Sequence, residues 1–141
     1  MKLVHVLLVE DNEGEIVLTL EAFEESKIKT NISVVKNGKD ALDFLHFKGK
    51  YKDVERPDLI LLDLNIPIIS GMEVLKEIKQ DVKLKTIPVV VLTTSSNPKE
   101  IKSAYELYTN SFVTKPLDMG EFLKAIISIE EFWLHICKLS D

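Results

Sequence analysis

The sequence predicts an α/β protein built on a doubly wound parallel sheet with helices on both faces. Short apolar runs rich in β-branched residues alternate with longer amphipathic stretches along the chain, which is typical of βαβ units. Several of these runs are apolar almost throughout, as strands are when helices cover both of their faces. The length of 141 residues, with 45% hydrophobic residues, fits one folded domain, and we expect a single domain over residues 1–141.

Five segments are predicted to be strands. They are Leu3–Val9, Ile32–Val35, Leu59–Leu62, Val89–Thr93 and Ser111–Thr114. The first, third and fourth are the most continuously apolar, so we expect them at the centre of the sheet.

Helices are predicted between these strands and after the last one. Glu13–Ser26, Gly38–Phe47 and Gly71–Gln80 carry apolar residues at helical spacing, a further helix begins at Asn97–Pro98, and the last runs from about Met119 to Cys137. This extended C-terminal helix, about 119–137, carries an apolar stripe that is a candidate contact for a homodimer. The stripe consists of Ile129, Phe132, Trp133 and Ile136.

Charge and composition exclude several classes of protein. A formal net charge of −5 repels a phosphate backbone, so we expect no binding to nucleic acid. No apolar stretch approaches the ~18 residues that span a bilayer, and the N-terminus lacks the basic-then-apolar layout of a signal peptide. The single Cys137 cannot form an intramolecular disulfide. We therefore expect a cytoplasmic protein that does not bind membranes.

Polar residues capable of chemistry follow every predicted strand except the second. They are Glu10, Asp11 and Asn12 after the first, Asp63 and Asn65 after the third, Thr93, Thr94 and Ser95 at the end of the fourth, and Lys115 after the fifth. Taken singly, such residues are more often turn or cap residues than ligands. As a set they lie at the carboxyl ends of parallel strands, where open α/β sheets bind their ligands.

A flavodoxin-like strand order of 2-1-3-4-5 would bring Glu10, Asp11 and Asp63 together, because it places the first and third strands side by side. Three crowded carboxylates repel one another unless their pKa values shift or a cation joins them. An oxygen-only cluster favours Mg²⁺. Together with the hydroxyl of Thr93 and the ammonium of Lys115, the cluster indicates phosphoryl chemistry.

Five motifs then resemble a response-regulator receiver domain over essentially the whole chain. They are LLVEDN at 7–12, LILLDLNIP at 59–67, SGMEVL at 70–75, IPVVVLTTS at 87–95 and TKP at 114–116. Their order, spacing and positions at strand ends match that family. Within it, the Thr-Thr-Ser run and IEEFWL at 129–134 resemble the stand-alone regulators that partner bacterial and cyanobacterial phytochromes.

The resemblance implies a role for each residue of the polar set. Asp63 would accept a phosphoryl group from a phosphohistidine on a sensor histidine kinase. A phytochrome is one candidate for that kinase. Mg²⁺ would bind Asp11 and Asp63 directly, Glu10 through water, and the backbone carbonyl of Asn65. Lys115 would pair with a phosphoryl oxygen.

The same resemblance implies a switch. Thr93 would turn its hydroxyl onto the phosphoryl group, and Phe112 would fill the space that Thr93 leaves. The bond before Pro116 is expected to be cis. The face made by the fourth helix, fifth strand and fifth helix would change, and it is a second candidate surface for a homodimer. Many relatives carry Tyr where this chain has Phe112, so here packing alone would report the switch.

These inferences predict a signalling phosphoacceptor that catalyses only its own phosphorylation and dephosphorylation. Two alternatives stay open within the family, a phosphorelay intermediate and a pseudo-receiver that binds partners without phosphorylation. An aspartate-nucleophile phosphatase is a third hypothesis, but such enzymes carry a second Asp two positions after the nucleophile, where this chain has Asn65.

Overall fold

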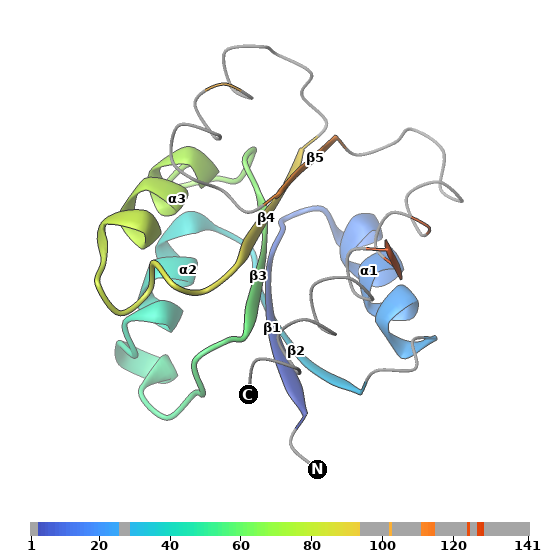
Figure 1. Ribbon diagram of the computed structural model, residues 1–141, viewed down its shortest axis with the longest axis horizontal. Coiled ribbons are helices and arrows are strands. Elements are labelled where there is room, and N and C mark those ends of the chain that lie inside the picture. The colour runs from blue at the N-terminus through green and yellow to red at the C-terminus, as the bar shows by residue number, and fades with distance from the viewer. Residues whose placement is uncertain are drawn as a thin grey trace.

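The computed structural model describes residues 3–25, 29–93 and 111–114, together with residues 102, 124, 127 and 128. Parallel strands form one five-stranded sheet in the order β2-β1-β3-β4-β5 (Figure 1). The strands are β1 (Val4–Val9), β2 (Thr30–Val35), β3 (Leu59–Asp63), β4 (Val89–Thr93) and β5 (Ser111–Thr114). The predicted fold class and strand order are therefore confirmed.

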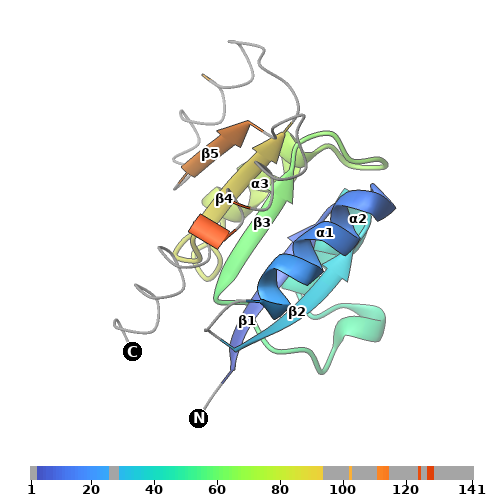
Figure 2. The same ribbon diagram turned by 90° about the vertical axis from the view of Figure 1, so that its right-hand side faces the viewer.

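Helices cover both faces of the sheet. The helices within the described ranges are α1 (Glu13–Glu24), α2 (Gly38–Leu45) and α3 (Gly71–Gln80), and a 3₁₀ turn follows at Gly49–Tyr51. In Figure 1, α1 lies on one side of the sheet and α2 and α3 lie on the other, and Figure 2 shows α1 in front of the strands. This arrangement is the doubly wound layering that the apolar strands predicted.

The strands alternate their side chains between two hydrophobic clusters. Leu7 and Val9 of β1 belong to the cluster under α2 and α3, whereas Val6 and Leu8 belong to the cluster under α1. Partly buried Ile127 packs against the cluster under α1. Because successive side chains of a strand point to opposite faces, a strand buried on both faces must be apolar at nearly every position.

Several predicted strand boundaries were wrong by one or two residues. Pairing begins at Val4 opposite Thr30, so β1 starts after the predicted Leu3 and β2 starts before the predicted Ile32. Asp63 is paired with Leu92 and extends β3 by one residue. These ends depend on the partner strand rather than on the apolar run.

Two predicted helices were too long. α2 stops at Leu45 instead of Phe47, whose φ of 57° is left-handed and incompatible with a right-handed helix. α1 stops at Glu24 instead of Ser26, and no basic residue lies in its last turn to offset the helix dipole. α3, β4 and β5 have the predicted bounds.

The predicted helix start at Asn97–Pro98 lies outside the described residues. The helix expected over about 119–137 does too, except that residues 124, 127 and 128 are helical. Among the helices of the described part of the chain, none is long and apolar enough to cross a membrane.

The helices α1, α2 and α3 each begin with a side-chain cap at the carboxyl edge of the sheet. Asn12, Asn37 and Ser70 accept hydrogen bonds from backbone N–H groups three residues later, at 3.0, 2.7 and 3.3 Å. Such caps satisfy backbone donors that the first turn of a helix leaves without partners. They also determine where the loops that lead from β1, β2 and β3 into the helices end.

Candidate functional site

Adjacent strands bring the acidic residues of two loops together. β1 lies beside β3 with Val9 opposite Leu62, so the next residue of each strand, Glu10 and Asp63, stands at the same level. The backbone N–H of Glu10 donates to the carbonyl of Val35 at 3.0 Å, which holds that end of β1 against β2 as well. The parallel register therefore places both carboxylates at one edge.

Glu10, Asp11 and Asp63 form a compact carboxylate cluster. One oxygen from each lies within 4.8 Å of the others. Glu10 and Asp63 are only 2% and 6% exposed, whereas Asp11 is exposed. The predicted convergence of these residues is thus observed.

The cluster fits a hard divalent cation. Buried carboxylates at this separation repel one another strongly, and a cation between them relieves that repulsion. All three donors are oxygens, which Mg²⁺ and similar ions prefer. Exposed Asp11 gives the cation an approach from solvent.

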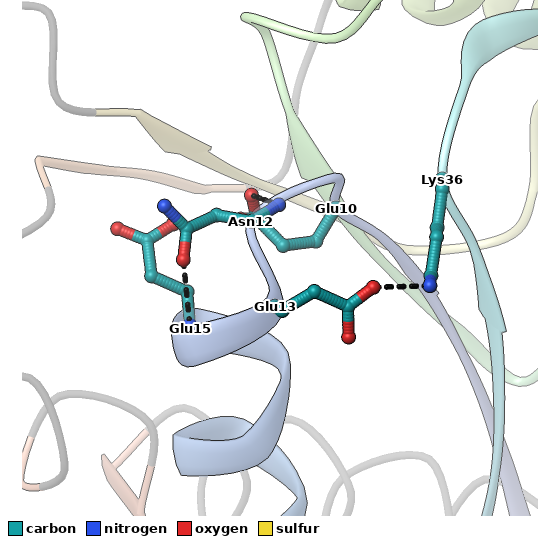
Figure 3. Close-up of polar contacts among 5 residues, drawn as sticks. All are labelled: Glu10, Asn12, Glu13, Glu15 and Lys36. Carbon is teal, nitrogen blue, oxygen red and sulfur yellow. Dashed lines mark hydrogen bonds and ion pairs between the residues drawn. The ribbon is translucent and has the colours of Figure 1, made fainter.

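Backbone donors orient the two buried carboxylates. The N–H of Asn12 donates to Glu10 Oε1 at 3.1 Å, and the N–H of Asn65 donates to Asp63 Oδ1 at 2.9 Å. Figure 3 shows that Asn12 also accepts, through Oδ1, the hydrogen bond from the N–H of Glu15 that caps α1. Asn12 therefore links the start of α1 to the position of Glu10. Asn12 was predicted only as one of the polar residues after the first strand, a type that more often serves as a turn or cap residue, and an Asn directly before a helix is a cap signal.

An ion pair connects the neighbouring loops. Glu13, in the first turn of α1, pairs with Lys36, the residue directly after β2 (Figure 3). Both side chains are largely exposed, so the pair contributes little to stability. It nevertheless ties the loop that carries Asp11 to the loop that leads into α2.

The loop between β3 and α3, residues 64–70, is held where its two ends meet and again in its middle. At its ends, the N–H of Gly71 donates to the carbonyl of Leu64 at 3.1 Å. A Cβ on Gly71 would lie 2.4 Å from the carbonyl oxygen of Asp63, so only glycine permits this approach. In the middle, the carbonyl of Pro67 accepts from the N–H groups of Gly38 at 3.2 Å and Ile69 at 2.9 Å.

The other predicted site residues are described only in part. Thr93 ends β4 and pairs with Thr114, and Phe112 lies in β5 opposite Val91. Their backbones lie on the strands predicted for them. β4, which carries Thr93, is next to the strand that carries Asp63, and β5, which carries Phe112, lies beyond β4. Lys115 and Pro116 lie outside the described residues.

A parallel sheet in this order, with a carboxylate cluster at its carboxyl edge, defines a class of signalling protein. The family model described as the response regulator receiver domain matches residues 6–127, and the chain belongs to that family. Receiver domains are signalling modules of two-component systems rather than classical enzymes.

Within this family the chain is closely related to phytochrome response regulators. It is 43% identical to the response regulator Rcp1 of Synechocystis sp. over 134 residues, which cover 95% of this chain and 91% of Rcp1. The structure of the phosphorylated cyanobacterial phytochrome response regulator RcpA matches with a TM-score of 0.92 and 44% identity over 94% of this chain and 95% of RcpA. The Mn²⁺-bound form of Rcp1 matches with a TM-score of 0.91 and 44% identity, over 93% of this chain and 94% of that one.

Proposed function

We propose that the chain is a phosphorylation-controlled switch in which Asp63 accepts a phosphoryl group from a phosphohistidine of a sensor histidine kinase. The observation that carries this proposal is the convergence of Glu10, Asp11 and Asp63 within 4.8 Å at the carboxyl edge of the sheet. The hydrogen bond from Asn65 to Asp63 supports it further, because it orients the accepting carboxylate.

Mg²⁺ is the proposed cofactor, with Asp11, Asp63 and the backbone carbonyl of Asn65 as direct ligands and Glu10 as a ligand through water. Support comes from the oxygen-only donor set and from the similarity to Rcp1, whose structure was determined with Mn²⁺ bound. When bound, the cation neutralises the charge that would otherwise repel an incoming phosphoryl group from the cluster.

The proposed reaction is an in-line displacement at phosphorus. A carboxylate oxygen of Asp63 forms the new O–P bond while the P–N bond to the histidine of the kinase breaks, and the imidazole leaves with the bonding electrons and takes up a proton. Lys115 then pairs with a phosphoryl oxygen, and Thr93 donates its hydroxyl to another. Phe112 repacks as Thr93 moves, and a cis bond before Pro116 shapes the loop that carries Lys115. On this proposal the chain catalyses only its own phosphorylation and dephosphorylation.

The proposal extends to partners and organisation. A phytochrome is the proposed kinase, because the chain is 44% identical to the phytochrome response regulator RcpA. We propose a single receiver domain over residues 1–141, with a homodimer formed through the C-terminal helix, about 119–137, or through the face of the fourth helix, fifth strand and fifth helix. The net charge of −5 argues against nucleic acid as a partner. A cytoplasmic location, typical of receiver domains, belongs to the same proposal.

Phosphorylation by acetyl phosphate tests the acceptor. The protein is incubated with acetyl phosphate and Mg²⁺, and intact mass spectrometry measures the gain of one phosphoryl group. We expect the gain in the wild type, its loss in Asp63→Asn, and its loss when a chelator removes the metal. Asp53→Asn is the matched control, because Asp53 is an exposed carboxylate outside the cluster.

Two results would contradict the proposal. A gain in Asp63→Asn equal to that of the wild type would move the acceptor elsewhere. No gain in the wild type, while a known receiver is phosphorylated in parallel, would favour a pseudo-receiver that binds partners without phosphorylation. Transfer of label from an autophosphorylated phytochrome, compared with an unrelated histidine kinase, then tests the proposed kinase.

A further inference from the structure

The first turn of α2 holds the 64–70 loop that follows the acceptor. The N–H of Gly38 donates to the carbonyl of Pro67 at 3.2 Å, and Gly38 is itself buried. The same carbonyl accepts from Ile69 across a turn centred on Ile68, whose φ is 72°. The loop thus follows a strained course that a contact from α2 supports.

Only glycine allows this contact. A Cβ on Gly38 would lie 1.9 Å from the carbonyl oxygen of Ile69 and 2.8 Å from its Cβ. Real Cβ atoms do not approach closer than 3.0 Å, so any side chain at position 38 would force the two segments apart by roughly 1 Å.

The loop is the segment that would move. α2 is anchored in the core by three side chains that are at most 3% exposed, Ala41, Phe44 and Leu45. The loop is anchored less firmly along Asn65–Ser70, where most residues are exposed, Ile66 alone is buried in the core, and Ile69 packs against the core only partly buried. Its far end is fixed, because Gly71 lies against the backbone of Asp63 and Leu64. A displacement at Ile69 is therefore passed back toward Asn65, whose N–H holds Asp63.

We propose that Gly38 is a positioning residue for divalent-cation binding at the acidic cluster. Its missing side chain lets α2 hold the loop where the Asn65 carbonyl and the Asp63 carboxylate reach the cation together. This inference rests on the proposed function. It adds a residue from the connection between β2 and α2, whereas Asp63 and Asn65 belong to the connection between β3 and α3, and Gly38 touches neither the cation nor the phosphoryl group.

Calorimetric titration of the full chain with Mg²⁺ tests the inference. In Gly38→Ala we expect the dissociation constant for Mg²⁺ to rise about tenfold, the size of effect that supporting residues of metal sites commonly have. The rate of phosphorylation by acetyl phosphate should fall at low Mg²⁺ and recover at saturating Mg²⁺. Lys39→Gly is the matched control, since Lys39 is an exposed residue in the same turn and its replacement by glycine loosens that turn without removing a core side chain or clashing with the loop. The Mg²⁺ affinity of Lys39→Gly should equal that of the wild type.

A second measurement needs no variant. Coupling between two sites is reciprocal, so Mg²⁺ should slow hydrogen exchange of the Gly38 amide in the wild type. The amide of Ala41, which donates to Asn37 within the same helix, serves as the internal reference. This measurement decides the matter if Gly38→Ala does not fold.

The outcomes separate this inference from the proposed function. If the wild type binds Mg²⁺ and accepts a phosphoryl group but Gly38→Ala binds Mg²⁺ equally well, the inference is wrong and the proposed function stands. An equal loss of Mg²⁺ affinity in Lys39→Gly, or a Gly38 amide whose hydrogen exchange does not respond to Mg²⁺, would also overturn the inference. A wild type that neither binds Mg²⁺ nor accepts a phosphoryl group would overturn both.

Discussion

Neutralising Asp63, the proposed acceptor, is expected to stabilise the protein in the absence of metal. Asp63 and Glu10 are both almost fully buried, with oxygens no more than 4.8 Å apart. At an effective dielectric constant of about 20, two charges at that distance repel by about 3 kcal/mol. Asp63→Asn removes this repulsion and keeps an oxygen that can accept from the N–H of Asn65. That hydrogen bond loses its charge assistance, which costs about 1 kcal/mol.

The net expectation is a gain of about 2 kcal/mol in the free energy of unfolding for Asp63→Asn in a chelator. Urea denaturation measures it. Mg²⁺ should reverse the ranking, because a cation that binds only the folded wild type adds about 2.7 kcal/mol to its free energy of unfolding at a hundred times its dissociation constant, which exceeds the lead of Asp63→Asn. Asp53→Asn, an exposed carboxylate outside the cluster, should leave the urea midpoint unchanged in both buffers.

An Asp63→Asn protein that is no more stable than the wild type in chelator would contradict this expectation. Such a result would mean that the carboxylates of the cluster do not repel one another as their spacing requires. A gain that persists unchanged in saturating Mg²⁺ would show instead that the cluster does not hold the cation.

Two further predictions concern residues away from the cluster. The backbone N–H of Lys83 is the largest of several causes that lower the pKa of Asp81 below 3.8. A carboxyl group whose pKa is lower in the folded state stabilises the fold at any pH above its pKa in the unfolded state. This stabilisation is lost as the pH falls through the pKa of the folded state. Asp81→Ala should therefore be less stable than the wild type at pH 7, with a gap in urea midpoints that narrows below about pH 4; a constant gap would contradict this. Ile68 has a φ of 72° and is 73% exposed, so Ile68→Gly relieves backbone strain with little loss of buried surface. The free energy of unfolding should rise by about 1 kcal/mol, and an unchanged or lower urea midpoint would contradict this prediction.

Local patterns in the sequence predicted most of the fold. The β-branched runs at Val89–Thr93 and Ser111–Thr114 and the apolar stripe of Gly71–Gln80 became β4, β5 and α3 with the predicted bounds. These patterns predict strands and helices because side chains on one face recur every 2 residues in a strand and about every 3.6 residues in a helix, and the buried face of either element carries apolar residues.

Boundaries that depend on a partner were less predictable. The start of β2 at Thr30 carries no apolar signal, since Thr30 joins the strand only because Val4 lies opposite it. The end of α2 is similar, because Phe47 suits a helix by composition and leaves it through a left-handed backbone. At Thr30 strand pairing, and at Phe47 a turn, outweighs the secondary structure that the local sequence favours.

For the site, the strand patterns along the chain identified the residues at the carboxyl ends of the strands, and the parallel order made the meeting of Glu10, Asp11 and Asp63 predictable. How those carboxylates are held depends on tertiary packing. The N–H of Asn12 on Glu10 and the contact of Gly38 with Ile69 join groups whose approach depends on backbone positions. Periodicity records which face of an element is buried, but it carries no information about the distance between two loops, because that distance is set by how the helices pack on the sheet.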